Sequence, residues 1–435
     1  MMRRVWELLP SSDLWRLVSV RGLRSLVQGY LMVVFAIYLG QIGFSAWLIG
    51  ITLTIGGIIS AVLTLITGVL SDRIGRRPFL LIFAGLYLLS GLILAFSTAA
   101  ALLIGVSALA GIGRGGGAGG QAGAFAPAEQ AIIAEKAPAR DRTRVFAINA
   151  IAGTLLSSVG ALLAGIPELL RSADHFSLIA SYRPLFLGVA LVGAVSLVIL
   201  WPVTERVKVV LTVEVQRSRR KRDRGTIKRI AIAGAFNGFG MGFLAGLIPY
   251  WMYVRFGVSP AAIGPVVGAS SFATSLLALV AVRLANRFGE VRVITGSRVV
   301  AAVLSLALPF SPAYPLAAAL YALRTVSSAM AMPVRQSYTM GIVDAESRGS
   351  AAGVSGVARR LPAAASPALS GYWIGIDALE LPFFASALFM GINAVLYYAW
   401  FHAQQPLDLD EPEPPNLAAD AHRPASLPQA SAVNA

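Results

Sequence analysis

The chain has 435 residues, of which 56% are hydrophobic and only 13% are charged. About a quarter of the residues of a soluble chain are charged, so these few charges could not cover a water-facing surface of this size. The composition therefore favours lipid as the solvent and an integral membrane protein. The sequence contains no cysteine, which excludes disulfides, thiolate metal sites and cysteine nucleophiles.

A net charge of +15 raises the question of a nucleic-acid partner, but the distribution of the charge argues against one. Lysines and arginines lie in short clusters between long apolar runs, which is the pattern that orients membrane proteins. The three histidines have no metal-ligand spacing, so no metal is expected. No removable signal peptide is predicted, because Arg3 and Arg4 precede no short apolar core with a cleavage site.

Long apolar runs dominate the sequence, and a spanning helix needs about 20 mostly apolar residues. Six such runs lie at 25–43, 47–70, 78–97, 101–126, 145–170 and 184–203. Six more lie at 230–253, 261–283, 292–310, 314–342, 350–375 and 380–401. We therefore predict an all-α membrane protein of twelve transmembrane helices.

The segments outside these runs differ in charge. We interpret residues 1–24 as a cytoplasmic N-terminal segment and the basic stretch 204–229 as a cytoplasmic linker. Residues 403–435 are rich in Pro, Ala, Asp and Glu, and we expect a disordered cytoplasmic tail. Basic residues gather at the N-terminus and after the second, fourth and sixth runs. We therefore predict a multi-pass protein of the cell membrane with both termini in the cytoplasm.

Two short blocks recur at corresponding places. The sequence LSDRIG at 70–75 follows the second run, and LANRFG at 284–289 follows the eighth. Directly after the fourth run PAEQ stands at 127–130, and late in the tenth PVRQ stands at 333–336. The chain is thus predicted to consist of two pseudo-symmetric six-helix bundles, at 25–203 and 230–402, with the same orientation.

The loop between the second and third runs, GVLSDRIGRR at 68–77, resembles the signature loop of the major facilitator superfamily. The resemblance implies secondary transport and a loop that latches the two halves at the cytoplasmic face. It carries over to Gly68, Asp72, Arg73, Gly75, Arg76 and Arg77. In the second copy Asn286 replaces the acid while Arg287 and Gly289 remain, so a weaker latch is expected there. The alternative, that these charges only mark the cytoplasmic face, stays open.

The residue types of this loop also predict specific contacts without reference to the family. Asp72 can pair with the neighbouring arginines or with the positive N-terminus of an adjacent helix. Gly75 permits a tight turn, and Gly68 would allow close contact between helices.

Two arginines fall near the middle of the membrane. By a rise of 1.5 Å per residue, Arg114 lies about 20 Å into the fourth helix and Arg324 about 15 Å into the tenth. The resemblance links an arginine at the place of Arg114 to proton coupling, while a ligand for an anionic substrate and a structural partner of backbone carbonyls are equal alternatives. A cavity with two arginines and few acids favours an anionic or neutral solute over a cation.

Other charged and polar groups complete the predicted site. Glu129 and Arg335 occupy matching positions, so we predict a salt bridge between the halves that acts as a gate, against the alternative of two independent interfacial charges. The possible cavity is expected to include Gln28, Tyr38, Asn237 and Arg359.

One literal motif is discounted. GIGRGG at 111–116 fits a dinucleotide fingerprint, but it lies inside an apolar helix with no βαβ unit. The sequence also has no phosphate-binding loop and no catalytic set of His, Cys or paired carboxylates, so neither a nucleotide nor an enzyme is predicted.

The predicted function is secondary transport of a small organic solute by alternating access. The family resemblance implies coupling to an ion gradient, by default protons, with no bound cofactor. Efflux, as by an antiporter, is favoured; uptake of an organic anion or metabolite is the alternative, and a non-transporting membrane sensor of the same fold is the second. The expected partners are the solute and the lipid bilayer, and the protein is expected to be a monomer.

Overall fold

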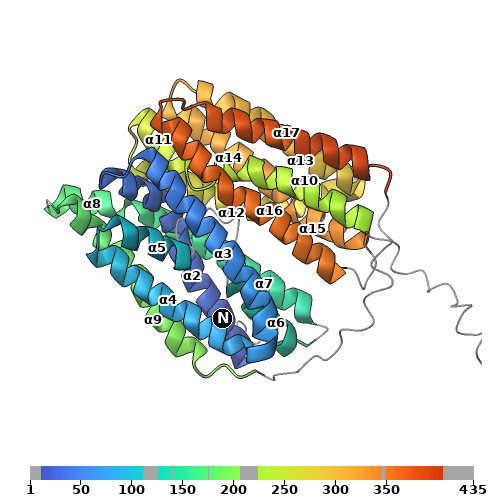
Figure 1. The fold of residues 1–435 in the computed structure, drawn as a ribbon, viewed down its shortest axis with the longest axis horizontal. Helices are drawn as coiled ribbons and strands as arrows, with labels where there is room; N and C mark the ends of the chain where they lie inside the picture. The colour runs from blue at the N-terminus through green and yellow to red at the C-terminus, as the bar shows by residue number, and fades with distance from the viewer. Residues whose placement is uncertain are drawn as a thin grey trace, which may run out of the picture.

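The structure is a computed structural model that describes residues 11–110, 125–138, 141–174, 176–205, 224–343 and 348–404. Within these ranges the regular structure is helical, and Figure 1 shows two groups of helices side by side. The N-terminal half contains α2 to α9 and the C-terminal half α10 to α17. Most of the predicted linker and tail lies outside the described residues, so those two assignments stay predictions.

The helices of the N-terminal half follow the predicted runs, except that residues 111–124 of the fourth run lie outside the described residues. They are α2 (Ser12–Gln41), α3 (Ala46–Ile74), α4 (Arg76–Phe96), α5 (Ala100–Ala110), α6 (Phe125–Lys136), α7 (Arg142–Leu162), the short 3-10 helix η2 (Leu163–Gly165), α8 (Ile166–Asp174) and α9 (Leu178–Leu200). Serine side chains cap three of them: the hydroxyls of Ser11, Ser45 and Ser177 accept a hydrogen bond from a backbone N–H in the first turn.

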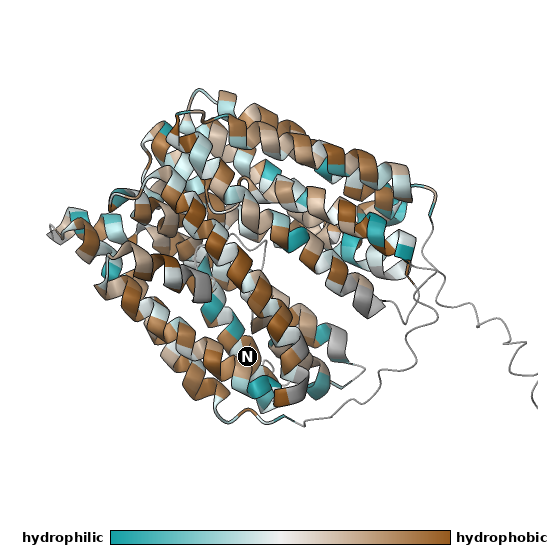
Figure 2. Cartoon of the chain, in the orientation of Figure 1, coloured by the Kyte–Doolittle hydropathy of each residue, from teal (hydrophilic) through white to brown (hydrophobic). Residues whose placement is uncertain are grey.

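The C-terminal half repeats this order. Its helices are α10 (Arg224–Gly242), α11 (Ile248–Phe256), α12 (Pro260–Phe288), α13 (Glu290–Ala307), the 3-10 helix η4 (Leu308–Phe310), α14 (Tyr314–Met330), α15 (Met332–Gly341), α16 (Arg348–Gly375) and α17 (Leu381–Phe401). In the described residues, 8 helices are long and apolar enough to cross a membrane, by length and composition. Figure 2 shows hydrophobic residues along most of their length.

The first helix is longer than its apolar run. We predicted its start at residue 25, whereas α2 begins at Ser12. Arg16, Arg21 and Arg24 lower the hydropathy of this stretch, but arginine is a good helix former and does not end the helix. Part of the segment predicted to precede the bundle therefore belongs to its first helix.

The same helix pairs pack in both halves. In the N-terminal half α2 packs on α7 and α4 on α9, and in the C-terminal half α10 packs on α16 and α13 on α17. Glycines permit the closest approaches at matching places: a side chain at Gly29 would overlap the backbone of Ser157, and one at Gly238 the backbone of Arg359. The internal repeat read from the loops thus extends to the packing.

The two halves meet through α3 with α16, α7 with α12 and α2 with α11. We call the end of the molecule that carries residues 68–77 and 286–289 the loop end, and the other the opposite end. Gly50 packs on Pro367 and Gly371, which places this contact toward the opposite end. Figure 1 shows α3 and α16 converging there and diverging toward the loop end.

A hydrogen-bonded side chain reinforces this contact between the halves. The Thr54 hydroxyl of α3 accepts a hydrogen bond from the Ala368 N–H at 2.9 Å and donates one to the Ala365 carbonyl at 3.4 Å. Both partners lie close to Pro367, which stands inside α16 and has no N–H to give. The hydroxyl therefore binds backbone groups where a proline disturbs the helix.

Candidate functional site

The loop between α3 and α4 turns at a glycine. Gly75 has a φ of 108°, a conformation that only glycine adopts readily, and Gly289 has a φ of 88° at the matching place. Directly after the turn, the Glu205 carboxylate accepts hydrogen bonds from the backbone N–H groups of Arg76 and Arg77, at 2.6 and 2.8 Å. A carboxylate at this place satisfies free N–H groups at the start of α4 and complements the helix dipole.

The loop arginines bind groups of their own half. Arg76 contacts the Glu135 carboxylate at 3.2 Å, and Arg77 donates to the backbone carbonyl of Trp201 while lying over its ring. The side chains of Asp72 and Arg73 lie outside the described part, so the latch stays a prediction.

Two further expectations for the loops can be compared with the structure. The contact expected at Gly68 is wrong for this structure, because a side chain added there would meet open space. In the second copy the side chains of Asn286 and Arg287 are exposed, and Arg287 lies over the Phe288 ring.

A second set of charges ties the first helix to the loop end. Lys136 at the end of α6 contacts the Asp13 carboxylate at 2.9 Å and the Thr204 hydroxyl at the same distance. Asp13 also pairs with Arg16 at 2.7 Å. Together with Glu205, these contacts anchor the chain after α9 to the start of α2, the start of α4 and the end of α6.

We expect Glu205→Gln to lower the free energy of unfolding by about 1 kcal/mol, because it removes a charge from two hydrogen bonds and from a helix N-terminus. Thermal unfolding of the purified protein in detergent measures this. Glu380→Gln is the matched control, since Glu380 precedes α17 without a side-chain capping bond. Equal melting temperatures for the two variants would contradict the expectation.

Glu129 lies in a buried polar cluster of the N-terminal half. Its side chain, 3% exposed, contacts the Arg24 guanidinium at 3.4 Å and accepts a hydrogen bond from the Asn149 amide at 3.0 Å. The Arg24 guanidinium also lies 3.5 Å from the centre of the Phe125 ring, a cation–π contact. In this structure Glu129 is thus paired within its own half and not with Arg335, and the gate stays a prediction for another state.

Of the two arginines predicted near the midplane, the structure describes only one. Arg114 lies outside the described residues. Arg324 is 5% exposed and donates hydrogen bonds to the hydroxyls of Ser305 at 2.7 Å and Ser386 at 3.2 Å. Ser386 in turn donates to the Gly240 carbonyl. Arg324 therefore links α14 to α13, α17 and α10 inside one half, which is the behaviour of a structural partner.

Sequence reasoning missed Arg298 of α13. This side chain is only 1% exposed, and one terminal nitrogen donates to the Ser328 carbonyl at 3.2 Å. The other nitrogens, Nε and Nη2, have no hydrogen-bond partner in the described residues. The depth argument used for Arg324 would have found Arg298, because it lies well inside the predicted run at 292–310.

Two amides occupy matching places near the middle of the bundle. Gln28 precedes Gly29 in α2, and Asn237 precedes Gly238 in α10, each glycine being a close-packing position. Asn237 is 3% exposed, and neither atom of its amide has a partner in the described residues, while Gln28 is partly exposed. Both remain candidates for contact with a solute.

The expectation for Tyr38 differs from the structure. Its ring is fully buried, with Phe186 at 4.9 Å and Tyr182 at 5.0 Å between ring centres. Aromatic residues from α2 and α9 fill the space around it, so Tyr38 lines no open cavity in this state.

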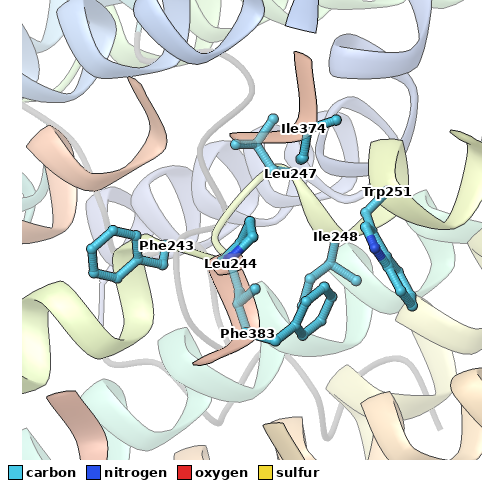
Figure 3. A pocket seen from close by; sticks show the side chains of 8 residues that line it. Phe243, Leu244, Leu247, Ile248, Trp251, Ile374 and Phe383 are labelled. Carbon is cyan, nitrogen blue, oxygen red and sulfur yellow. The ribbon is translucent and has the colours of Figure 1, made fainter. Parts of the chain in front are cut away.

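A pocket at the opposite end of the C-terminal half is apolar. It is too narrow to hold a water molecule, and its lining residues include Phe243, Leu247, Trp251 and Phe383 (Figure 3). Its lining offers no charged group, and the Trp251 indole N–H has no partner in the described residues. The polar clusters above are therefore the better candidates for a site.

The helices and their doubled packing define a multi-pass membrane protein with two six-helix halves. The family model described as Major Facilitator Superfamily matches residues 17–227 and 230–432, and the chain belongs to this family. It is therefore a membrane transport protein, and transporters of this family bind small-molecule solutes within the membrane.

Solved structures share the fold at low sequence identity. The crystal structure of the nucleoside transporter NupG is 15% identical with a TM-score of 0.66, covering 91% of this chain and 100% of that chain. The inward open xylose transporter XylE from E. coli is 16% identical with a TM-score of 0.68, covering 89% and 96%.

A curated relative matches a shorter segment. The uncharacterized membrane protein YJR124C of Saccharomyces cerevisiae is 33% identical over 160 residues, which are 36% of this chain and 34% of that protein. The match thus spans about a third of the relative's length.

Proposed function

We propose that this transporter moves a small organic solute across the cell membrane by alternating access, as a monomer, with efflux driven by exchange for protons. The contact between the halves toward the opposite end supports the mechanism. There the halves meet through small residues and the Thr54 hydrogen bonds, contacts that can separate without leaving large voids.

The proposed orientation follows from charge. Lysines and arginines gather at the loop end, which we assign to the cytoplasm together with both termini. The state described above would then be open toward the cytoplasm. Movement of one half against the other would close the loop end and part α3 from α16, which is how alternating access works in this class of fold.

The matched amides of Gln28 and Asn237 support a polar solute. Their places on α2 and α10 put one amide from each half near the bilayer midplane, where transporters bind solutes between their repeats. An amide offers both a donor and an acceptor, and a buried amide without a partner is costly. A solute bound there would satisfy it.

Flux in proteoliposomes tests the proposal. The purified chain is reconstituted and a panel of organic anions, neutral metabolites and drugs is assayed, each with and without an imposed pH gradient. We expect at least one solute to move, and to move faster with a proton gradient of the correct sign. If no solute moves under any gradient, the chain acts as a non-transporting sensor instead.

Substitution of the two amides tests the proposed site in the same flux assay, with a matched control. Gln28→Leu and Asn237→Leu are expected to lower transport at a given solute concentration, whereas Gln130→Leu, the same change at an exposed place of α6, is not. Equal loss in all three would remove the midplane site from the proposal.

Uptake of an organic anion is the second candidate function. It is favoured by the buried arginines of the C-terminal half, in particular Arg298, whose charge has no acidic partner in the described residues. The direction of flux in the same assay separates uptake from efflux.

A further inference from the structure

The buried arginines of the two halves fall into two kinds. Arg24 has the Glu129 carboxylate, and Arg324 has two serine hydroxyls. Arg298, Arg335 and Arg359 have neither: within the described ranges no salt bridge reaches any of them. Nitrogens of Arg298 and Arg335 are also buried there without a hydrogen-bond partner.

These three arginines lie together. They stand on α13, α15 and α16, of which α15 packs on both of the others, and the charge of Arg298 lies within electrostatic reach of those of Arg335 and Arg359. By a rise of 1.5 Å per residue they are about 12, 9 and 16 Å from the loop ends of their helices. The cluster therefore occupies one layer of the C-terminal half, between its loop end and the midplane.

The cluster is open on one side. Arg335 and Arg359 are partly exposed, while Arg298 lies fully buried behind them. The backbone of Arg359 packs against Gly238, the residue after Asn237, so the unpartnered amide lies at the same level of the bundle. A molecule that contacts Arg359 is within reach of the candidate solute site.

The charge of the cluster is the central observation. Buried cations in a membrane protein cost several kcal/mol each unless they meet a partner or a water-filled cavity, and three neighbouring ones also repel each other. In the described part of this half the acids are Glu290 at the start of α13 and Asp377 and Glu380 between α16 and α17, the last two at the opposite end. Within the described ranges, these three positive charges thus have no carboxylate in contact with them.

We propose that Arg298, Arg335 and Arg359 form the binding site for a small organic anion that carries two or more negative charges on carboxylate or phosphate groups. The guanidinium group is planar and can bind either a carboxylate or a phosphate through two parallel hydrogen bonds. A single negative charge would leave most of the cluster uncompensated, whereas two or three would balance it. This inference rests on the proposed transport function and names its substrate class.

Ligand-induced stabilisation of the purified full-length protein tests the proposal. Citrate supplies clustered carboxylates and glycerol 3-phosphate supplies a phosphate, and acetate and glycerol are the matched compounds with one charge and none. At constant ionic strength, we expect a saturable rise in melting temperature with citrate or glycerol 3-phosphate and none with acetate or glycerol. The stronger of the two responses identifies the oxyanion, and the absence of both overturns the proposal.

Charge-removing variants locate the site. Arg335→Gln and Arg359→Gln are each expected to weaken anion binding at least about tenfold, equivalent to about 1.4 kcal/mol. Arg255→Gln is the matched control, because it removes the same charge from an exposed position of α11 at the opposite end and is expected to bind as the wild type does. Arg298 is fully buried, so the two partly exposed arginines carry the test. Equal affinity in Arg335→Gln, Arg359→Gln and Arg255→Gln would overturn the assignment.

The outcome is separable from that of the transport proposal. Flux of neutral solutes by a protein that binds neither anion would leave transport standing and refute the arginine site. Saturable anion binding that depends on Arg335 and Arg359, without any flux, would support the site and refute transport.

Discussion

Glu129→Ala is expected to lower the free energy of unfolding by about 3–5 kcal/mol, the usual cost of removing one partner of a buried ion pair. The Arg24 guanidinium would stay buried without its carboxylate, and the Asn149 amide would lose its acceptor. Chemical unfolding of the purified protein in mixed micelles measures the loss.

Two controls make this test specific. Glu135→Ala breaks the more exposed pair with Arg76 at the loop end and should cost no more than about 1 kcal/mol. The double variant Arg24→Met/Glu129→Met replaces the whole pair with apolar groups and should recover most of the loss. A similar loss from Glu129→Ala and Glu135→Ala would show that the buried pair does not stabilise this half.

Gly371→Val is expected to shift the protein away from the state described here. A side chain at Gly371 would overlap the Ala46 carbonyl and crowd Gly50, so the contact between α16 and α3 could not form as it stands. Parting these helices opens the opposite end while each half keeps its own core. We expect the population open at this end to rise at least about tenfold, a bias of about 1.4 kcal/mol.

Thiol labelling reports this shift cleanly, because the natural chain has no cysteine. Ala164→Cys places a thiol where η2 faces Gly264 of α12, a fully buried position between the halves. Its labelling rate should rise in the Gly371→Val background. Gly391→Val in α17 is the control, since a side chain there meets open space. Unchanged labelling would mean that the contact of α3 with α16 does not hold this state.

Local chemistry made much of the fold predictable. Apolar length gave the helical runs, and the repeated blocks around Asp72 and Asn286 gave the two matched halves, which the packing of the described helices repeats. Gly75 was expected at a turn, and both it and its counterpart Gly289 adopt positive φ. These features depend on a few adjacent residues, so a single sequence is enough to find them.

The pairing of charges could not be obtained in the same way. Hydropathy places Arg24 just outside the first run, and nothing in the sequence marks it as a partner for Glu129, although α2 extends past it toward the loop end. Arg324 was expected to face a solute, because its position along the helix placed it near the midplane. Depth does not reveal which way a side chain points, and Arg324 makes its hydrogen bonds to Ser305 and Ser386 inside its own half. Which face of a helix a charge occupies depends on neighbours that are distant in the sequence.

The bond between Thr54 and the backbone around Pro367 also has a consequence for the rate of the transport cycle. Whenever α3 leaves α16, the Ala368 N–H and the Ala365 carbonyl lose their hydroxyl partner. A backbone N–H or carbonyl without a hydrogen-bond partner is costly in the membrane, so water has to replace the Thr54 hydroxyl as the helices part. Hydration of the helix backbone beside Pro367, beyond side-chain packing, would then help to set how fast this end opens.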